Sequence, residues 1–188
     1  MKFIKKQWSN ILFVVFIVLM IIPQTRMPIQ VFIQRNISFS PSEITKEDRT
    51  TLKYYNWNLA TLNSEKINLS KSEGKVIIIN FWATWCPPCV AEMPELQELY
   101  NKYGDKVDFY FITNEKPEKV SFFLEKKGFN LPVFLQIEKS PAVLESSSLP
   151  TTYVISKSGE IVIRKTGAAS WNSDSVHEVL DGLLGSDF

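Results

Sequence analysis

The stretch Val76-Ile-Ile-Ile-Asn-Phe-Trp-Ala-Thr-Trp-Cys-Pro-Pro-Cys-Val-Ala-Glu-Met-Pro-Glu-Leu96 decides the fold of this chain. Its first part, 76–82, is apolar and rich in β-branched and aromatic side chains, apart from Asn80. Such a run is typical of a strand that is buried on both faces, as in a parallel sheet covered by helices. After it, apolar side chains recur at spacings of three or four as far as Tyr103, which predicts an amphipathic helix.

The only two cysteines of the chain, Cys86 and Cys89, stand where the predicted strand turns into the predicted helix. Pro87 and Pro88 lie between them, and proline suits the first turn of a helix, where its missing N–H costs nothing. Cys86 is therefore expected at a helix N-terminus, where unpaired N–H groups and the helix dipole stabilise a thiolate. Such a site can lower a thiol pKa from about 8.5 into the range of roughly 3.5–7.5. Cys89, one turn further on, can then close a disulfide with Cys86. Cys86, at the exposed start of the turn, is expected to attack, and Cys89, shielded inside the helix, is expected to resolve.

The residues around this pair resemble those of thioredoxin-like proteins, in particular the membrane-anchored TlpA/ResA-like thiol-disulfide oxidoreductases. The resemblance covers residues 52–185 and rests on the motif at 80–89, on Glu92 and Pro94 after it, and on Leu149-Pro150-Thr151-Thr152. It implies an α/β, thioredoxin-like fold with a central mixed β-sheet flanked by helices, and an N-terminal β-hairpin before the core. It also implies a redox-active Cys86–Cys89 disulfide and no bound cofactor.

The resemblance further implies a client-binding surface beside the cysteines. Trp85 and the segment Leu149, Pro150 and Thr151 are its expected members. We expect the Leu149–Pro150 peptide bond to be cis and to pack against Cys86, because a native cis proline usually marks a tight functional turn. The alternative is an ordinary proline at the start of a strand.

Glu92 is the candidate for handling protons. Thioredoxins carry a buried aspartate near the cysteines, and that place is here taken by Asn80, which cannot exchange a proton. Glu92 lies three residues after Cys89, so a helix puts both on one face, and the TlpA/ResA-like family has a glutamate at this spacing. A carboxylate beside a buried thiol pair can have a raised pKa and accept the Cys89 proton. The alternative is a solvated glutamate that only favours the helix dipole.

The remainder of the domain alternates between strand and helix signals, which predicts a layered α/β sheet. A hairpin is expected from two short runs that flank a turn at Asn63-Ser64. Further strands are expected at 107–113, 133–135, 153–155 and 161–163, and helices at 117–127 and 176–184.

Composition excludes several kinds of partner. The chain has 188 residues, with 21 Lys and Arg against 20 Asp and Glu, so no charge field would attract nucleic acid. A structural zinc site usually needs four ligands, whereas two cysteines and one histidine are present. We therefore expect no metal, and we expect His177 to be a surface or packing residue.

The N-terminal part predicts attachment to a membrane. Lys2, Lys5 and Lys6 precede Ile11–Ile22, an unbroken run of 12 apolar residues, which is short against the roughly 20 that a spanning helix needs. The alternative is the core of a signal peptide, but no small-residue cleavage site follows. Both the anchor and the signal peptide would place the rest of the chain outside the cytoplasm, because lysines before an apolar segment stay on the cytoplasmic side. The predicted organisation is a cytoplasmic tail at 1–10, a membrane anchor or uncleaved signal at 11–23, a linker at 24–50 and a thioredoxin-like domain at 51–188.

The expected function is an extracytoplasmic, periplasmic-side reductase of client disulfides. The family resemblance implies apocytochrome c and other exported proteins as clients, and a membrane thiol carrier as electron donor. A peroxidase of related fold is one alternative, although its Pro-x-x-x-Thr/Ser-x-x-Cys setting does not precede Cys86. A binding module braced by the disulfide is another, although so small a loop gains little stability from closure.

Overall fold

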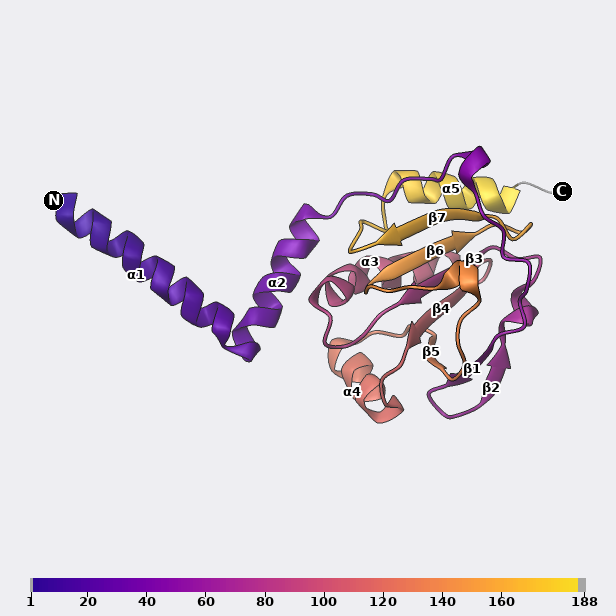
Figure 1. Ribbon diagram of the computed structural model, residues 1–188, viewed down its shortest axis with the longest axis horizontal. Coiled ribbons are helices and arrows are strands. Elements are labelled where there is room, and N and C mark those ends of the chain that lie inside the picture. Colours follow the sequence, from indigo (N-terminus) through magenta and orange to yellow (C-terminus); the bar gives the residue numbers. More distant parts are fainter. Residues whose placement is uncertain (1, 186–188) are drawn as a thin grey trace.

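The apolar run 76–82 forms β3 (Ile77–Phe81), an interior strand of a seven-stranded sheet in the computed structural model, which describes residues 2–185 (Figure 1). β3 pairs in parallel with β4 (Asp108–Thr113) and antiparallel with β6 (Thr151–Ile155), so the sheet is mixed, as predicted. All five residues of β3 are buried, because both faces of the sheet are covered.

The strand order is β2-β1-β5-β4-β3-β6-β7. The bounds of the outer strands are β1 (Asn58–Thr61), β2 (Lys66–Asn68), β5 (Val133–Gln136) and β7 (Ile161–Thr166). β5 continues the parallel part beside β4, and β7 pairs antiparallel with β6. The predicted hairpin is confirmed as β1 and β2, which extend the sheet beyond β5, and Ser64 in its turn has φ of 67°.

Three helices, α3 (Pro87–Tyr103), α4 (Pro117–Lys127) and α5 (Asp174–Gly185), pack on one face of the sheet. β3, β4 and β5 advance across the sheet in one direction, so the right-handed crossovers through α3 and α4 place both helices on the same face. α4 has the bounds that the sequence predicts, since it begins at a proline and ends at Gly128, whose φ is 71°.

The opposite face is covered without α-helices. Buried side chains such as Leu52 and Trp57, from the chain before β1, pack there with the 3₁₀ turns η2 (Leu69–Ser72) and η3 (Ala142–Leu144). The prediction of a sheet flanked by helices therefore holds for one face of the sheet only.

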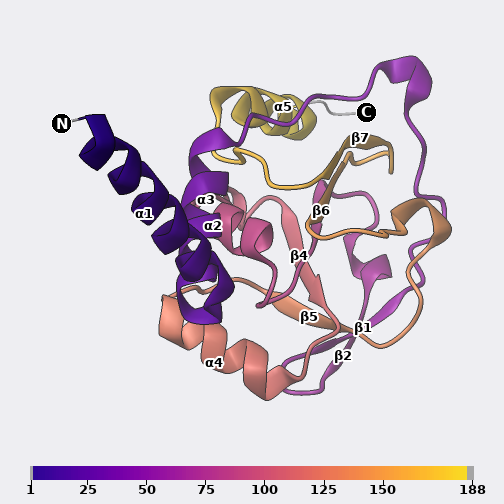
Figure 2. The same ribbon diagram turned by 60° about the vertical axis from the view of Figure 1, so that its left-hand side comes forward.

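Residues 24–50, predicted to be a linker, are largely attached to the domain. They begin in α2 (Pro23–Ile37), which packs against α3 (Figures 1 and 2). After α2 the chain, including a 3₁₀ turn, η1 (Lys46–Asp48), follows the outer edge of β7. The Ile44 N–H donates to the Val162 carbonyl at 2.8 Å, and the Ile161 N–H donates to the Thr50 carbonyl at 2.8 Å. An edge strand offers such unpaired groups, so this stretch is not a free tether.

α1 (Lys2–Ile21) precedes α2 and projects away from the domain (Figure 1). Its apolar side chains from Ile11 to Leu19 are exposed. In the part of the chain that the structure describes, no helix combines the length and the apolarity needed to cross a membrane. The side chains of Lys2, Lys5 and Lys6, on which the predicted orientation depends, lie outside the described ones, as do residues 186–188 at the end of the predicted domain.

Candidate active site

Cys86 and Cys89 form a disulfide at the start of α3, with an S–S distance of 2.10 Å and a Cα–Cα distance of 5.3 Å. Cys86 is the N-cap residue, and the Cys89 N–H points at its sulfur, with N and Sγ 3.3 Å apart. The predicted position of Cys86 at a helix N-terminus is thus confirmed. After reduction, the same N–H and the helix dipole would stabilise a Cys86 thiolate.

Both sulfurs are shielded from solvent. Cys86 is 4% exposed and Cys89 is 1% exposed, so the expected exposure of Cys86 is not found, although its neighbour Trp85 is 63% exposed. Both cysteines pack in the core of the domain with residues such as Trp82 and Met93. α2 lies over the first turn of α3. A cavity of about 210 Å³ separates the two helices there, lined by Arg26, Gln30, Ile33, Gln34, Pro87 and Pro88.

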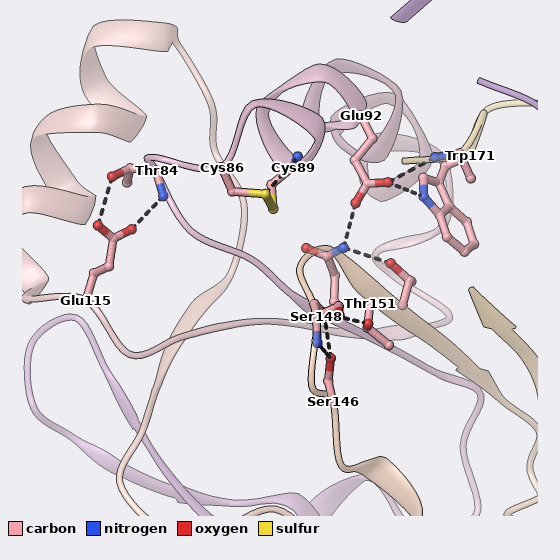
Figure 3. The surroundings of a disulfide bond; sticks show 12 residues. Thr84, Cys86, Cys89, Glu92, Glu115, Ser146, Ser148, Thr151 and Trp171 are labelled. Carbon is pink, nitrogen blue, oxygen red and sulfur yellow. Dashed lines mark hydrogen bonds between the residues drawn. A yellow bond between two sulfur atoms is a disulfide. The ribbon is translucent and has the colours of Figure 1, made fainter. Parts of the chain in front are cut away.

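The turn before Cys86 is held by Glu115, which follows β4. The Glu115 carboxylate accepts hydrogen bonds from the Thr84 N–H at 2.5 Å and from the Thr84 hydroxyl at 2.9 Å (Figure 3). Burial alone would raise the pKa of Glu115, but hydrogen bonds from Lys119 and Thr84 outweigh it and hold the pKa below its usual value. The carboxylate therefore stays ionised and fixes the backbone two residues before the disulfide.

Glu92 is buried inside the domain, with 2% of its surface exposed. The Asn80 side-chain amide donates to Oε1 at 2.9 Å, and the Trp171 indole N–H donates to Oε2 at 2.9 Å (Figure 3). The Ala169 N–H also donates to Oε2, at 3.2 Å. The alternative of a solvated glutamate is therefore wrong.

Burial raises the pKa of Glu92 to about 8, against the hydrogen bonds from Trp171, Asn80 and Ala169, which favour the charged form. The nearby Glu95 adds a smaller upward contribution to the pKa. The carboxyl group therefore gains or loses its proton close to neutral pH, as a proton carrier must.

Asn80 is not an inert substitute for an acid. Besides Glu92, its side-chain amide donates to the Thr152 hydroxyl at 2.8 Å, so it joins α3 to β6 through β3. Trp171, fully buried in the loop before α5, was not recognised from the sequence as a site residue. The only signal was general: a buried tryptophan needs an acceptor for its N–H.

The Leu149–Pro150 peptide bond is cis, as predicted. Pro150 and Thr151 are buried, and the Thr151 hydroxyl donates to the Ser148 carbonyl at 2.8 Å (Figure 3). Both side chains therefore pack inside the domain. Leu149 is half-buried and shares with the exposed Trp85 the lining of a cavity of about 210 Å³.

This cavity continues into a polar groove of about 610 Å³. The two share four lining residues, namely Phe81, Asn114, Gln136 and Leu149. The groove extends to Ser146, Ser147 and Arg164. Trp85 and Leu149 therefore stand at one end of a channel that leads away from the disulfide turn.

His177 is a packing residue in the contact between α5 and α3. Its ring stacks on Tyr103, with centroids 5.7 Å apart. Across residues 2–185, no three His, Cys, Asp or Glu side chains gather in a way that would hold a metal ion.

The sequence profile of the AhpC/TSA family matches residues 51–164, which is more than half of the chain. The chain belongs to this family. The match begins before the hairpin and ends in β7, so it contains the cysteine pair, Glu92 and the cis proline.

Among curated relatives, the thioredoxin-like protein YneN of Bacillus subtilis is 38% identical over 109 residues, which are 56% of this chain and 64% of that protein. The thiol-disulfide oxidoreductase ResA of Bacillus cereus is 34% identical over 134 residues, which are 69% of this chain and 73% of that protein. The chain thus spans a little less than two thirds of YneN and somewhat more of this ResA.

Solved structures share the fold at lower identity. A secreted thiol-disulfide isomerase from Corynebacterium glutamicum superposes with a TM-score of 0.56 at 22% identity, covering 76% of this chain and 88% of that one. A DsbF homologue from Corynebacterium diphtheriae gives 0.56 at 23% identity, covering 76% and 93%. At these identities the likeness concerns the thioredoxin-like α/β fold alone.

Proposed function

We propose that this chain is a thiol-disulfide oxidoreductase that reduces disulfides of exported client proteins. The observation that carries the proposal is the Cys86–Cys89 disulfide at the N-terminus of α3, one helical turn before the buried Glu92. Kinship with the ResA protein of Bacillus cereus supports it.

In the proposed reaction, the Cys86 thiolate attacks a client disulfide and forms a mixed disulfide, while one client thiolate leaves. Cys89 then gives its proton to Glu92 and attacks Cys86, which releases the second client thiolate. The client gains two electrons, and the Cys86–Cys89 pair loses them and becomes the disulfide of this structure. A membrane thiol carrier is the proposed donor that reduces the pair again.

The client binds, in this proposal, as an extended segment along the channel that begins at Trp85 and Leu149. The exposed indole of Trp85 offers a surface for an apolar side chain, while the backbone beside Pro150 is the proposed pairing partner for the client backbone. Exported proteins with exposed disulfides fit such a channel, and apocytochrome c is the client that we propose.

An insulin-reduction assay with dithiothreitol tests the activity. The wild type should accelerate precipitation of the insulin B chain, whereas Cys86→Ser/Cys89→Ser should match the buffer. A disulfide that merely braces the fold would give no acceleration with either chain. If the chain consumed hydrogen peroxide faster than it reduced insulin disulfides, the alternative peroxidase function would be assigned instead.

We also propose that the domain lies outside the cytoplasm and is attached to the membrane through α1. The apolar, exposed side chains of Ile11–Leu19 and the lysines before them support this topology. Protease added to spheroplasts should digest the domain at 51–188, and alkaline carbonate should leave the chain with the membrane. Full protection of the domain would contradict the topology, and release by carbonate would contradict the attachment.

A further inference from the structure

A groove of about 630 Å³ separates α2 from α4 and borders the start of α3. α2 lines it with apolar side chains alone, among them Met27 and Phe32. α4 lines it with two phenylalanines and with three lysines, Lys119, Lys126 and Lys127. Every charged side chain of this lining is therefore cationic.

The charges of α4 are divided between two flanks of the helix. Glu118 and Glu125 lie one residue before Lys119 and Lys126, so each is turned by roughly 100° away from the lysine that lines the groove. Lys119 is paired with Glu115. Neither Lys126 nor Lys127 has a carboxylate partner among residues 2–185. The groove thus presents two positive charges without a carboxylate partner, at the C-terminal end of α4.

Two large aromatic side chains stand exposed at the same groove. Phe122 is 64% exposed and Phe32 is 70% exposed, and the Lys126 ammonium lies 5.8 Å from the centre of the Phe122 ring. Aromatic rings flanked by lysines suit a membrane interface, where rings enter the headgroup region and ammonium groups meet lipid phosphates.

The groove also adjoins the segment that we place at the membrane. α1 ends at Ile21, and α2 begins at Pro23, four residues before the groove residue Met27. Both views show the α1–α2 junction on the side of the domain that carries α4 (Figures 1 and 2). We infer that the α2–α4 groove docks on anionic phospholipid, with Lys126 and Lys127 at the phosphates and Phe32 and Phe122 at the interface. This inference rests on the proposed membrane attachment.

Docking would set the distance of the redox site from the bilayer. Thr84 and Val90, which flank the cysteine motif, line the same groove. The Cys86–Cys89 pair would therefore stay at the membrane surface, within reach of a thiol carrier embedded in it, while the client channel beyond Leu149 stays open to solvent.

Lysine footprinting on the full chain tests this inference. The chain is reconstituted in vesicles of phosphatidylcholine, with or without phosphatidylglycerol, and is acetylated briefly before mass spectrometry. Lys126 and Lys127 should react about fivefold to tenfold more slowly on the anionic vesicles, since each lysine gains from the surface potential. Lys66 and Lys71, exposed at the hairpin side, should react equally on both and serve as internal references. High salt should restore the rate, because it screens the surface.

Matched charge reversals give a second readout. On anionic vesicles, hydroxyl radicals should oxidise Phe122 slowly in the wild type and in Lys66→Glu/Lys71→Glu, but several-fold faster in Lys126→Glu/Lys127→Glu. Lys126 could instead be labelled equally on both vesicle types while the chain still floats with the vesicles. This result would overturn the docking and leave the membrane attachment intact. The groove would then be assigned to a protein partner. A chain that does not float with vesicles at all would overturn both.

Discussion

Cys89→Ser should trap client proteins as mixed disulfides through Cys86, whereas Cys86→Ser should trap none. Cys86 has the helix N-terminus and the Cys89 N–H to stabilise its thiolate, so it is the better nucleophile. Cys89 lies inside the helix and is buried, and its disulfide partner is Cys86, so Cys89 is expected to resolve the mixed disulfide. Trapped species would appear as high-mass bands on non-reducing gels that dithiothreitol removes. Both variants should lose insulin reduction down to the level of the buffer.

The control for this experiment is Cys86→Ser/Cys89→Ser, which should show no adduct. Bands that appear with Cys86→Ser and not with Cys89→Ser would reverse the two roles. The direction of the reaction needs a separate measurement in growing cells. Thiol alkylation followed by a gel-mobility shift should show that the wild-type Cys86–Cys89 pair is substantially reduced. A fully oxidised pair would make the protein an oxidase.

Features that depend on neighbours in the sequence were predictable. β3 follows from an unbroken apolar run, and the position of Cys86 follows from the prolines that start α3. The hairpin follows from two strand signals around Asn63-Ser64, and it was found there. The cis peptide at Pro150 came from family resemblance, because local rules alone favour an ordinary proline.

Features that depend on distant contacts were not predictable. Glu115 meets Thr84 from 31 residues away, and Trp171 meets Glu92 from 79 residues away, so no spacing rule connects them. The packing of α2 against α3 was not predicted for the same reason, since the stretch at 24–50 was expected to be a linker. Polarity of a segment does not reveal that the edge of β7 offers it hydrogen bonds.

Glu92→Gln should make the oxidised protein more stable above about pH 8 and leave it nearly unchanged at pH 4. The fold raises the Glu92 pKa to about 8, chiefly through burial, so the folded chain keeps a proton that the unfolded chain loses near pH 4.5. The contribution of Glu92 to the free energy of unfolding is therefore complete below about pH 4.5 and is lost as the pH rises through 8. The loss is roughly 3 to 5 kcal/mol, and glutamine, which stays neutral, escapes it. Denaturant unfolding across this window measures the difference between the two chains.

The same substitution should slow the reaction, and this separates a proton carrier from a merely buried acid. Glu92→Gln removes the proposed acceptor of the Cys89 proton, so resolution of the mixed disulfide should slow about 100-fold near neutral pH. The rate should also lose its titration near pH 8, since that titration belongs to Glu92. Glu125→Gln, the same change at an exposed position of α4, should alter neither the stability profile nor the rate. If Glu92→Gln shifted only the stability profile and kept the rate and its pH dependence, Glu92 would be a structural acid, and the Cys89 proton would have to leave directly to water.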